Sequence, residues 1–203
     1  MTQLDFLDGR KSVRTFDTTS QISNQEIMYI LSHAANAPSG NNFQPWKVFV
    51  VKNKEKQEIL KNISFKQQQI ADASAVFLIF GDKSNYDIQK IMKFNLENHI
   101  ISENQLTEKT SRVHTYLKLH PEDICNEGLR FDNGLFAMNL MHTIREFGYE
   151  SNPMRGTDFQ KIMEFLNIPQ NLEPILMLPL GKPLKAGYPH RRYPTNDFVE
   201  IIE

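Results

Sequence analysis

The chain has 203 residues, with 23 Lys and Arg against 24 Asp and Glu, so its formal net charge is −1 at pH 7. That balance argues against a general nucleic-acid-binding protein, which usually carries a basic excess. The chain has one cysteine, Cys125, so it forms no disulfide framework or Cys-x-x-Cys site by itself, which suits a reducing cytosol. Its length and 40% hydrophobic content predict one domain over residues 1–203.

No segment of the sequence predicts secretion or membrane insertion. The first ten residues lack the apolar core of a signal peptide. The longest apolar run, residues 75–80, is far too short to span a bilayer. We therefore expect a cytoplasmic protein with no membrane partner.

The first half of the chain centres on a turn-rich loop at residues 37–46, which reads Ala-Pro-Ser-Gly-Asn-Asn-Phe-Gln-Pro-Trp. The preceding helix begins at a capping box formed by Ser23 and Glu26 and ends before Pro38. Residues 48–51 then predict a strand. Backbone N–H groups, a hydroxyl and carboxamides held in such a loop suit a planar, hydrogen-bonding ligand. An ordinary helix-to-strand connection is the alternative.

The other predicted elements alternate between helices and buried strands, which indicates an α+β or α/β domain. Residues 75–80 are apolar on both faces, as in a central strand. Residues 132–147 predict a helix that is apolar nearly all round and ends at Gly148, so we expect a central helix or one shared with a second subunit. The remaining elements are a short helix at residues 4–7, a helix after Asn53, partly helical residues 86–118, an extended segment at 151–153, a helix at 157–166 and a strand at 174–180.

Two basic clusters lie at opposite ends of the chain, at residues 10–14 and 190–192. Taken singly, each is typical of solvated surface charge. Arginine and serine together are also what a phosphate monoester requires, because they offer planar paired donors and a hydroxyl.

Four segments together resemble the FMN-dependent nitroreductase family. Residues 37–46 resemble its Pro-Ser-x-x-Asn-x-Gln-Pro-Trp signature, and residues 10–14 resemble its N-terminal Arg-x-Ser-x-Arg segment. Pro153-Met154-Arg155-Gly156 and residues 190–194 match two later motifs in the same order. The resemblance implies an α+β, nitroreductase-like fold. Its central, mostly antiparallel sheet is flanked by helices, and its C-terminal segment extends onto a partner subunit.

The resemblance also implies the cofactor-binding residues. Arg10, Ser12 and Arg192 are expected to bind the FMN phosphate, with His190 where the family often has lysine. Arg14 and Gln69 are expected at the flavin pyrimidine, and the N–H groups of residues 154–156 at flavin N5 and O4. Whether Lys66 contacts the flavin stays open. The full implied set is Arg10, Lys11, Ser12, Arg14, Pro38, Ser39, Gly40, Asn42, Gln69, Met154, Arg155, Gly156, His190 and Arg192.

The activity implied by the resemblance is an FMN-dependent oxidoreductase that uses NADH or NADPH to reduce nitroaromatics, quinones or similar electron-poor acceptors. The family mechanism is ping-pong, on a homodimer with two flavins at its interface, and flavin N5 carries the chemistry without a catalytic side chain. The sequence contains no Gly-x-Gly-x-x-Gly and no metal-ligand spacing. Two alternatives remain: other flavin chemistry, such as flavin fragmentation, dehalogenation or azoline oxidation, and a non-enzymatic binding protein.

Overall fold

A four-stranded antiparallel sheet lies at the centre of the computed structural model, which describes residues 2–203. The strand order is β1-β2-β4-β3, and each neighbouring pair is antiparallel. The strands are β1 (Trp46–Val51), β2 (Ala75–Gly81), β3 (Glu150–Ser151) and β4 (Glu173–Gly181). The expected α+β class with a mostly antiparallel sheet is confirmed.

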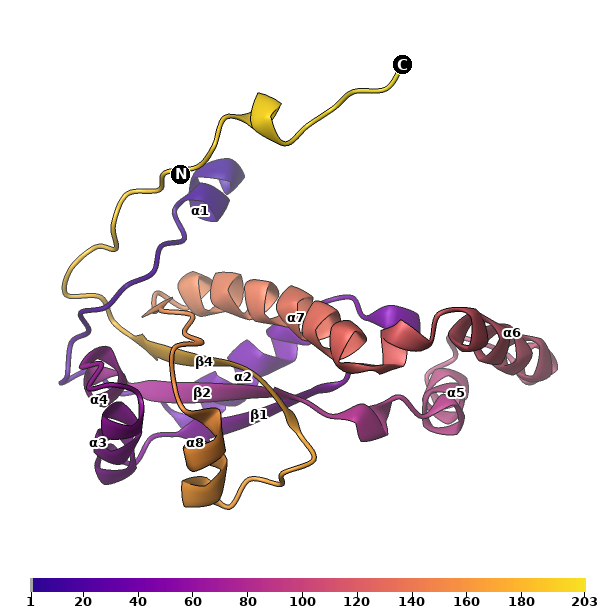
Figure 1. Ribbon diagram of the computed structural model, residues 1–203, viewed down its shortest axis with the longest axis horizontal. Helices are drawn as coiled ribbons and strands as arrows, with labels where there is room; N and C mark the ends of the chain where they lie inside the picture. Colours follow the sequence, from indigo (N-terminus) through magenta and orange to yellow (C-terminus); the bar gives the residue numbers. More distant parts are fainter. Residues whose placement is uncertain (1) are drawn as a thin grey trace.

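Helices cover both faces of this sheet, and Figure 1 shows α7 on one side and α8 on the other. The helices are α1 (Gln3–Asp8), α2 (Asn24–Ala34), α3 (Lys54–Ile63), α4 (Gln69–Asp72), α5 (Ile88–Glu97), α6 (Leu106–Leu119), α7 (Asn126–Glu146) and α8 (Phe159–Leu166). Among residues 2–203, no helix combines the length and the apolar character needed to cross a membrane.

Strand β2 divides the core into two parts because successive side chains of a strand point to opposite faces. Phe77 and Ile79 pack with α2 and α7 on one face. Leu78 and Phe80 pack with residues of α3, α4 and α8 on the other. Every residue of β2 is buried, which confirms the predicted central strand.

Capping explains several boundaries. The Ser23–Glu26 capping box forms as predicted at the start of α2, and Asn53 caps α3 by accepting a hydrogen bond from the Lys56 N–H. Helix α8 begins at residue 159, later than predicted, because the Asp158 side chain accepts the Lys161 N–H and acts as its cap. Helix α7 begins at residue 126, six residues before the predicted start, and Gly148 follows its end with φ 71° as expected.

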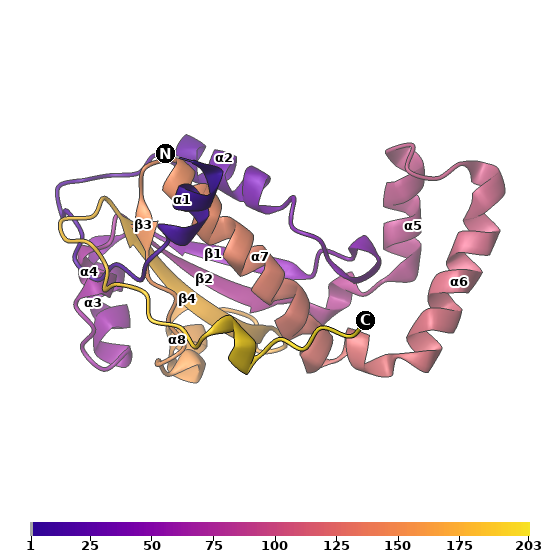
Figure 2. The same ribbon diagram turned by 90° about the horizontal axis from the view of Figure 1, so that it is seen from above.

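Helices α5 and α6 form a separate projection, which we call the helical arm (residues 88–119). Figures 1 and 2 show the arm beyond one end of the sheet. A small core joins it to the turn-rich loop, made of Phe43, Ile91, Met92, Val113 and Leu117. The Phe43 ring also meets the Tyr86 ring edge-on, with the centroids 5.3 Å apart. The loop and the arm are therefore packed as one unit.

Candidate functional site

The two ends of the chain run side by side next to β3. The Val13 N–H donates to the Ser151 carbonyl at 3.1 Å, which places the N-terminal segment beside β3. The Leu184 N–H donates to the Thr15 carbonyl at 2.9 Å, so the chain leaving β4 returns along the same segment. The basic clusters at residues 10–14 and 190–192 thus lie in neighbouring segments, although almost the whole sequence separates them.

Gly187 makes the closest approach between these two segments. A Cβ atom placed on Gly187 would lie 2.7 Å from the Lys11 Cβ and 2.8 Å from the Ser12 carbonyl oxygen. Real Cβ atoms do not sit that close to other heavy atoms, so the contact requires glycine. One residue further, the Tyr188 ring lies under the Arg14 guanidinium, 5.7 Å from its carbon to the ring centroid.

The structure thus brings residues 187 and 188, which precede the second basic cluster, against the first cluster. The His190 Nε2 atom is buried and has no hydrogen-bond partner among residues 2–203. Arg192 donates to the carbonyl of its neighbour Arg191 at 2.7 Å. Two guanidinium groups cannot hydrogen-bond to each other, and no hydrogen bond within that same range joins Arg192 to Ser12, so the meeting of Arg10, Ser12 and Arg192 on one phosphate stays a prediction.

A glutamine pair lies beside the loop at residues 154–157. The Gln69 amide nitrogen donates to the Gln67 Oε1 at 2.9 Å and lies 3.6 Å from the Met154 sulfur. The Gln67 amide nitrogen donates to the Gly156 carbonyl at 3.0 Å. Gln69 is only 7% exposed. Through its hydrogen bond, the Gln67 amide fixes the position of the Gly156 peptide.

The expected role of the 154–156 backbone needs one correction. The Met154 N–H donates to the Met177 carbonyl at 2.8 Å, and the reverse bond measures 2.9 Å. Met154 therefore completes the sheet, and its N–H is not free for a ligand. Within residues 2–203, the N–H groups of Arg155 and Gly156 have no hydrogen-bond acceptor, so two of the three predicted donors remain available.

The turn-rich loop is held in an uncommon backbone conformation. Asn41, Asn42 and Gln44 have φ values of 47°, 60° and 50°, and asparagine tolerates this left-handed region better than most residues do. The Ser39 hydroxyl accepts the Gln44 N–H at 3.0 Å, while Pro38, Gly40 and Asn42 stay exposed. The loop thus presents polar groups from a fixed shape.

Asp132 of α7 ties this loop to the body of the protein, a role that the sequence pattern did not reveal. Its carboxylate accepts the Gly40 N–H at 2.9 Å and the Tyr86 hydroxyl at 3.1 Å. The residue is only 3% exposed. Burial raises the pKa of Asp132, and the two hydrogen bonds offset part of that rise.

These groups form two half-sites at opposite ends of the sheet. Trp46, the last residue of the loop, pairs with Gly81 at one end of β2. Ala75, at the other end of β2, is linked through Leu180 to Ser151 and so to the N-terminal segment. The six residue steps between Ala75 and Gly81 span about 20 Å. One chain therefore holds the loop half-site and the basic half-site apart.

Comparison with known proteins identifies the family. The model of the Nitroreductase family matches residues 7–182. The chain belongs to the nitroreductase family. Among solved structures, a nitroreductase-like protein from Streptococcus mutans is 53% identical, with a TM-score of 0.96 and 98% of each chain covered. The predicted family is confirmed.

Two further relatives carry chemical information about nitroreductase-family proteins. A crystal structure from Exiguobacterium sibiricum, described as a nitroreductase in complex with FMN, is 29% identical with a TM-score of 0.90 and covers 100% of this chain and 98% of its own. A Lactiplantibacillus plantarum protein named CLA biosynthesis enone reductase is 30% identical over 98% of this chain and 93% of its own length. Bacillus subtilis relatives carry the name NAD(P)H nitroreductase.

Proposed function

We propose that this nitroreductase-family chain is an FMN-dependent enzyme that uses NADH or NADPH to reduce nitroaromatics, quinones or similar electron-poor acceptors. The observation that carries the proposal is the pairing of the two chain ends. Gly187, three residues before the basic cluster 190–192, lies against Lys11 and Ser12, the two residues that follow Arg10, which supports a shared phosphate site. A family relative with FMN bound supports the same cofactor here.

The residues of the basic half-site fit a flavin phosphate. Arg10 and Arg192 offer paired guanidinium donors, and Ser12 offers a hydroxyl. The Nε2 atom of His190 is buried and has no hydrogen-bond partner in the part of the chain that the structure describes. Because buried polar atoms are rarely left unpaired, this atom supports a ligand at this point. We assign the phosphate to these four residues, with Lys11 adding positive charge nearby.

The flavin ring fits the groups that lie next to this phosphate site. The unpaired N–H groups of Arg155 and Gly156 would face the ring, and open space beside Gly156 permits close approach. Gln69 would meet the pyrimidine, and Arg14 would place positive charge near its edge. When bound, FMN supplies the redox chemistry by taking a hydride from NAD(P)H and passing two electrons to the acceptor.

We further propose a homodimer whose two flavins lie at the interface, each chain forming one domain over residues 1–203. A flavin ring is too short to reach across about 20 Å of sheet, so Pro38, Ser39, Gly40 and Asn42 of one chain would meet the basic half-site of the other. The C-terminal segment supports this arrangement. Phe198, Ile201 and Ile202 are 70%, 83% and 93% exposed, and exposed apolar groups of this kind mark contact surfaces.

The deciding experiment is a flavin titration followed by reduction. We expect a yellow protein that binds one FMN per chain, is bleached anaerobically by NADH or NADPH, and is reoxidised by a nitroaromatic or a quinone. Steady-state double-reciprocal lines should be parallel, as for a ping-pong mechanism. A protein that takes up no FMN at micromolar concentration would overturn the proposal and favour a binding protein without redox activity.

Reduction of a conjugated enone is the second candidate function, because the enone reductase relative aligns with 98% of this chain. The same two half-sites would serve it, with hydride added to the β-carbon and a proton to the α-carbon. Anaerobic turnover with an enone, followed by product analysis, separates it from the first candidate. A saturated ketone as product together with no nitroaromatic turnover would favour the enone reductase.

A further inference from the structure

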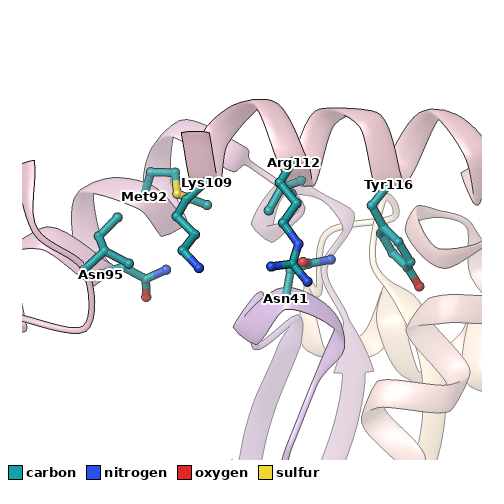
Figure 3. Close-up of a pocket in the computed structure, with 8 residues that line it drawn as sticks. Asn41, Met92, Asn95, Lys109, Arg112 and Tyr116 are labelled. Atoms are coloured by element: carbon teal, nitrogen blue, oxygen red, sulfur yellow. The ribbon is translucent and has the colours of Figure 1, made fainter. Parts of the chain in front are cut away.

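A pocket of about 400 Å³ lies between the helical arm and the turn-rich loop. Figure 3 shows the side chains of α6 and α5 converging on it, with Asn41 of the loop on the facing side. Its lining residues are Asn41, Met92, Asn95, Ile101, Lys109, Arg112, Val113 and Tyr116. Its volume is that of a typical small-molecule site.

Two cations line this pocket one helical turn apart. Lys109 and Arg112 both belong to α6, and neither lies within 4.0 Å of a carboxylate in residues 2–203. In Figure 3 the Arg112 guanidinium extends toward Asn41, and Lys109 points to the side where Asn95 lies. Tyr116, which also lines the pocket, donates its hydroxyl to the Asp123 carboxylate.

The rest of the lining combines apolar and polar groups. Met92, Ile101 and Val113 contribute hydrocarbon or thioether surface, and Asn41 and Asn95 contribute carboxamides. The Tyr116 hydroxyl is already bonded to Asp123, and among residues 2–203 no serine or threonine lines the cavity. A phosphate usually recruits hydroxyl or backbone N–H donors in addition to basic side chains. A carboxylate has two oxygens that one guanidinium binds as a pair. The lining therefore fits an apolar body that ends in a carboxylate better than it fits a phosphate.

The pocket is attached to the loop half-site. Asn41 lines the pocket, and the next residue, Asn42, belongs to the proposed flavin-binding loop. Phe43 packs into the core of the arm, so the position of Lys109 and Arg112 is fixed relative to Asn42. A molecule held by the two cations would lie beside the proposed flavin.

We propose that the preferred electron acceptor is an apolar molecule with a carboxylate, and that Lys109 and Arg112 bind this carboxylate. The assignment rests on the proposed function, because it places the acceptor over the flavin. It concerns specificity: the two cations would favour an anionic acceptor over a neutral one of the same size and similar electron affinity.

The test compares 4-nitrobenzoate with its neutral methyl ester on the FMN-loaded protein. In the variant K109Q/R112Q we expect kcat/KM for 4-nitrobenzoate to fall roughly tenfold, as for the loss of charge-assisted bonds at a partly exposed site. Values for the ester, NADH and NADPH should stay unchanged. The matched control is K83Q/K118Q, which removes the same charge at exposed lysines that do not line the pocket.

Each other outcome decides against the assignment. Equal losses for acid and ester, no loss for either, or a loss confined to NADH or NADPH would overturn it. Calorimetric binding of 4-nitrobenzoate to the oxidised protein gives a readout without turnover. If the wild type reduces neither compound, the proposed function fails. The pocket is then judged by whether K109Q/R112Q, and not K83Q/K118Q, weakens that binding.

Discussion

Replacing Asp132 by alanine tests whether one buried carboxylate holds the turn-rich loop in its binding shape. The carboxylate accepts two hydrogen bonds, from the Gly40 N–H at 2.9 Å and from the Tyr86 hydroxyl at 3.1 Å. Asp132 lies on α7, whereas Gly40 lies in the loop. The substitution therefore removes the direct polar link between the loop and the central helix.

The expected loss of stability depends on which donors can turn to water. Gly40 is exposed, so its N–H regains a water partner at little cost. The half-buried Tyr86 hydroxyl loses its acceptor, which costs about 1–3 kcal/mol. The substitution also removes the penalty of burying a carboxylate, whose pKa is raised for that reason. We expect a net loss of about 1–2 kcal/mol in the free energy of unfolding.

The Asp132→Asn variant isolates the charge and has a defined pH dependence. Because the folded state raises the pKa of Asp132 above its ordinary value of 3.8, the folded protein binds this proton more tightly than the unfolded chain does. The contribution of Asp132 to the free energy of unfolding is therefore most favourable below pH 3.8, and it declines as the pH rises through the raised pKa. Asp132→Asn should remove that decline.

Urea unfolding of the apo-protein and FMN titration measure these effects. Asp132→Ala should lower stability as stated and weaken FMN binding by roughly tenfold, since a loosened loop must be ordered again on binding. Tyr86→Phe is the matched variant because it removes only the hydroxyl. The effects of the two substitutions should be coupled in a double-mutant cycle. Unchanged stability and FMN affinity in Asp132→Ala, or strict additivity, would refute the reasoning.

Three other results are expected. Arg10→Ala and Arg192→Ala should each raise the FMN dissociation constant about tenfold or more, and their effects should be coupled. Neither substitution should change the affinity for riboflavin, which lacks the phosphate. Fluorescence titration of both flavins checks this, and additive effects on FMN binding would contradict it. Gly187→Ala places a Cβ atom 2.7 Å from the Lys11 Cβ, so FMN affinity should fall several-fold in the same titration. Truncation after Pro194 should weaken the proposed dimer, and light scattering across a dilution series should then show monomers that the full chain does not form.

The elements with strong local signals were predictable from the sequence. The cap of α2 depends on residues three positions apart, Ser23 and Glu26, and it forms as predicted. Strand β2 is apolar at nearly every position, and its burial on both faces follows from that composition. The expectation that motifs far apart in the sequence meet at one site came only from their resemblance to a family, since local patterns hold no information about long-range contacts.

What the sequence did not reveal depends on such contacts. Asp132 was predicted only as the first residue of a helix, because nothing local shows that its carboxylate faces Gly40, 92 positions earlier. The Met154 N–H was expected to be free, but it pairs with Met177. The pairing of Met154 with Met177 depends on how the segment around residue 154 is aligned with β4. The range 86–118 was only partly assigned, because its apolar residues form a small core with Phe43 from outside the range.

The separation of the two half-sites has a consequence for the symmetry of the proposed enzyme. Each chain presents Arg10 and its neighbours at one end of the sheet and the loop with Asn42 at the other, about 20 Å away. A twofold dimer that brings one chain's loop to the other's basic half-site repeats the same contact at the second site. Such an assembly necessarily has two equal flavin sites and none within a single chain. The helical arm follows the loop through Phe43, so the chain that supplies Asn42 to a flavin would also supply Lys109 and Arg112. Acceptor selection and phosphate binding at each site would then come from different chains.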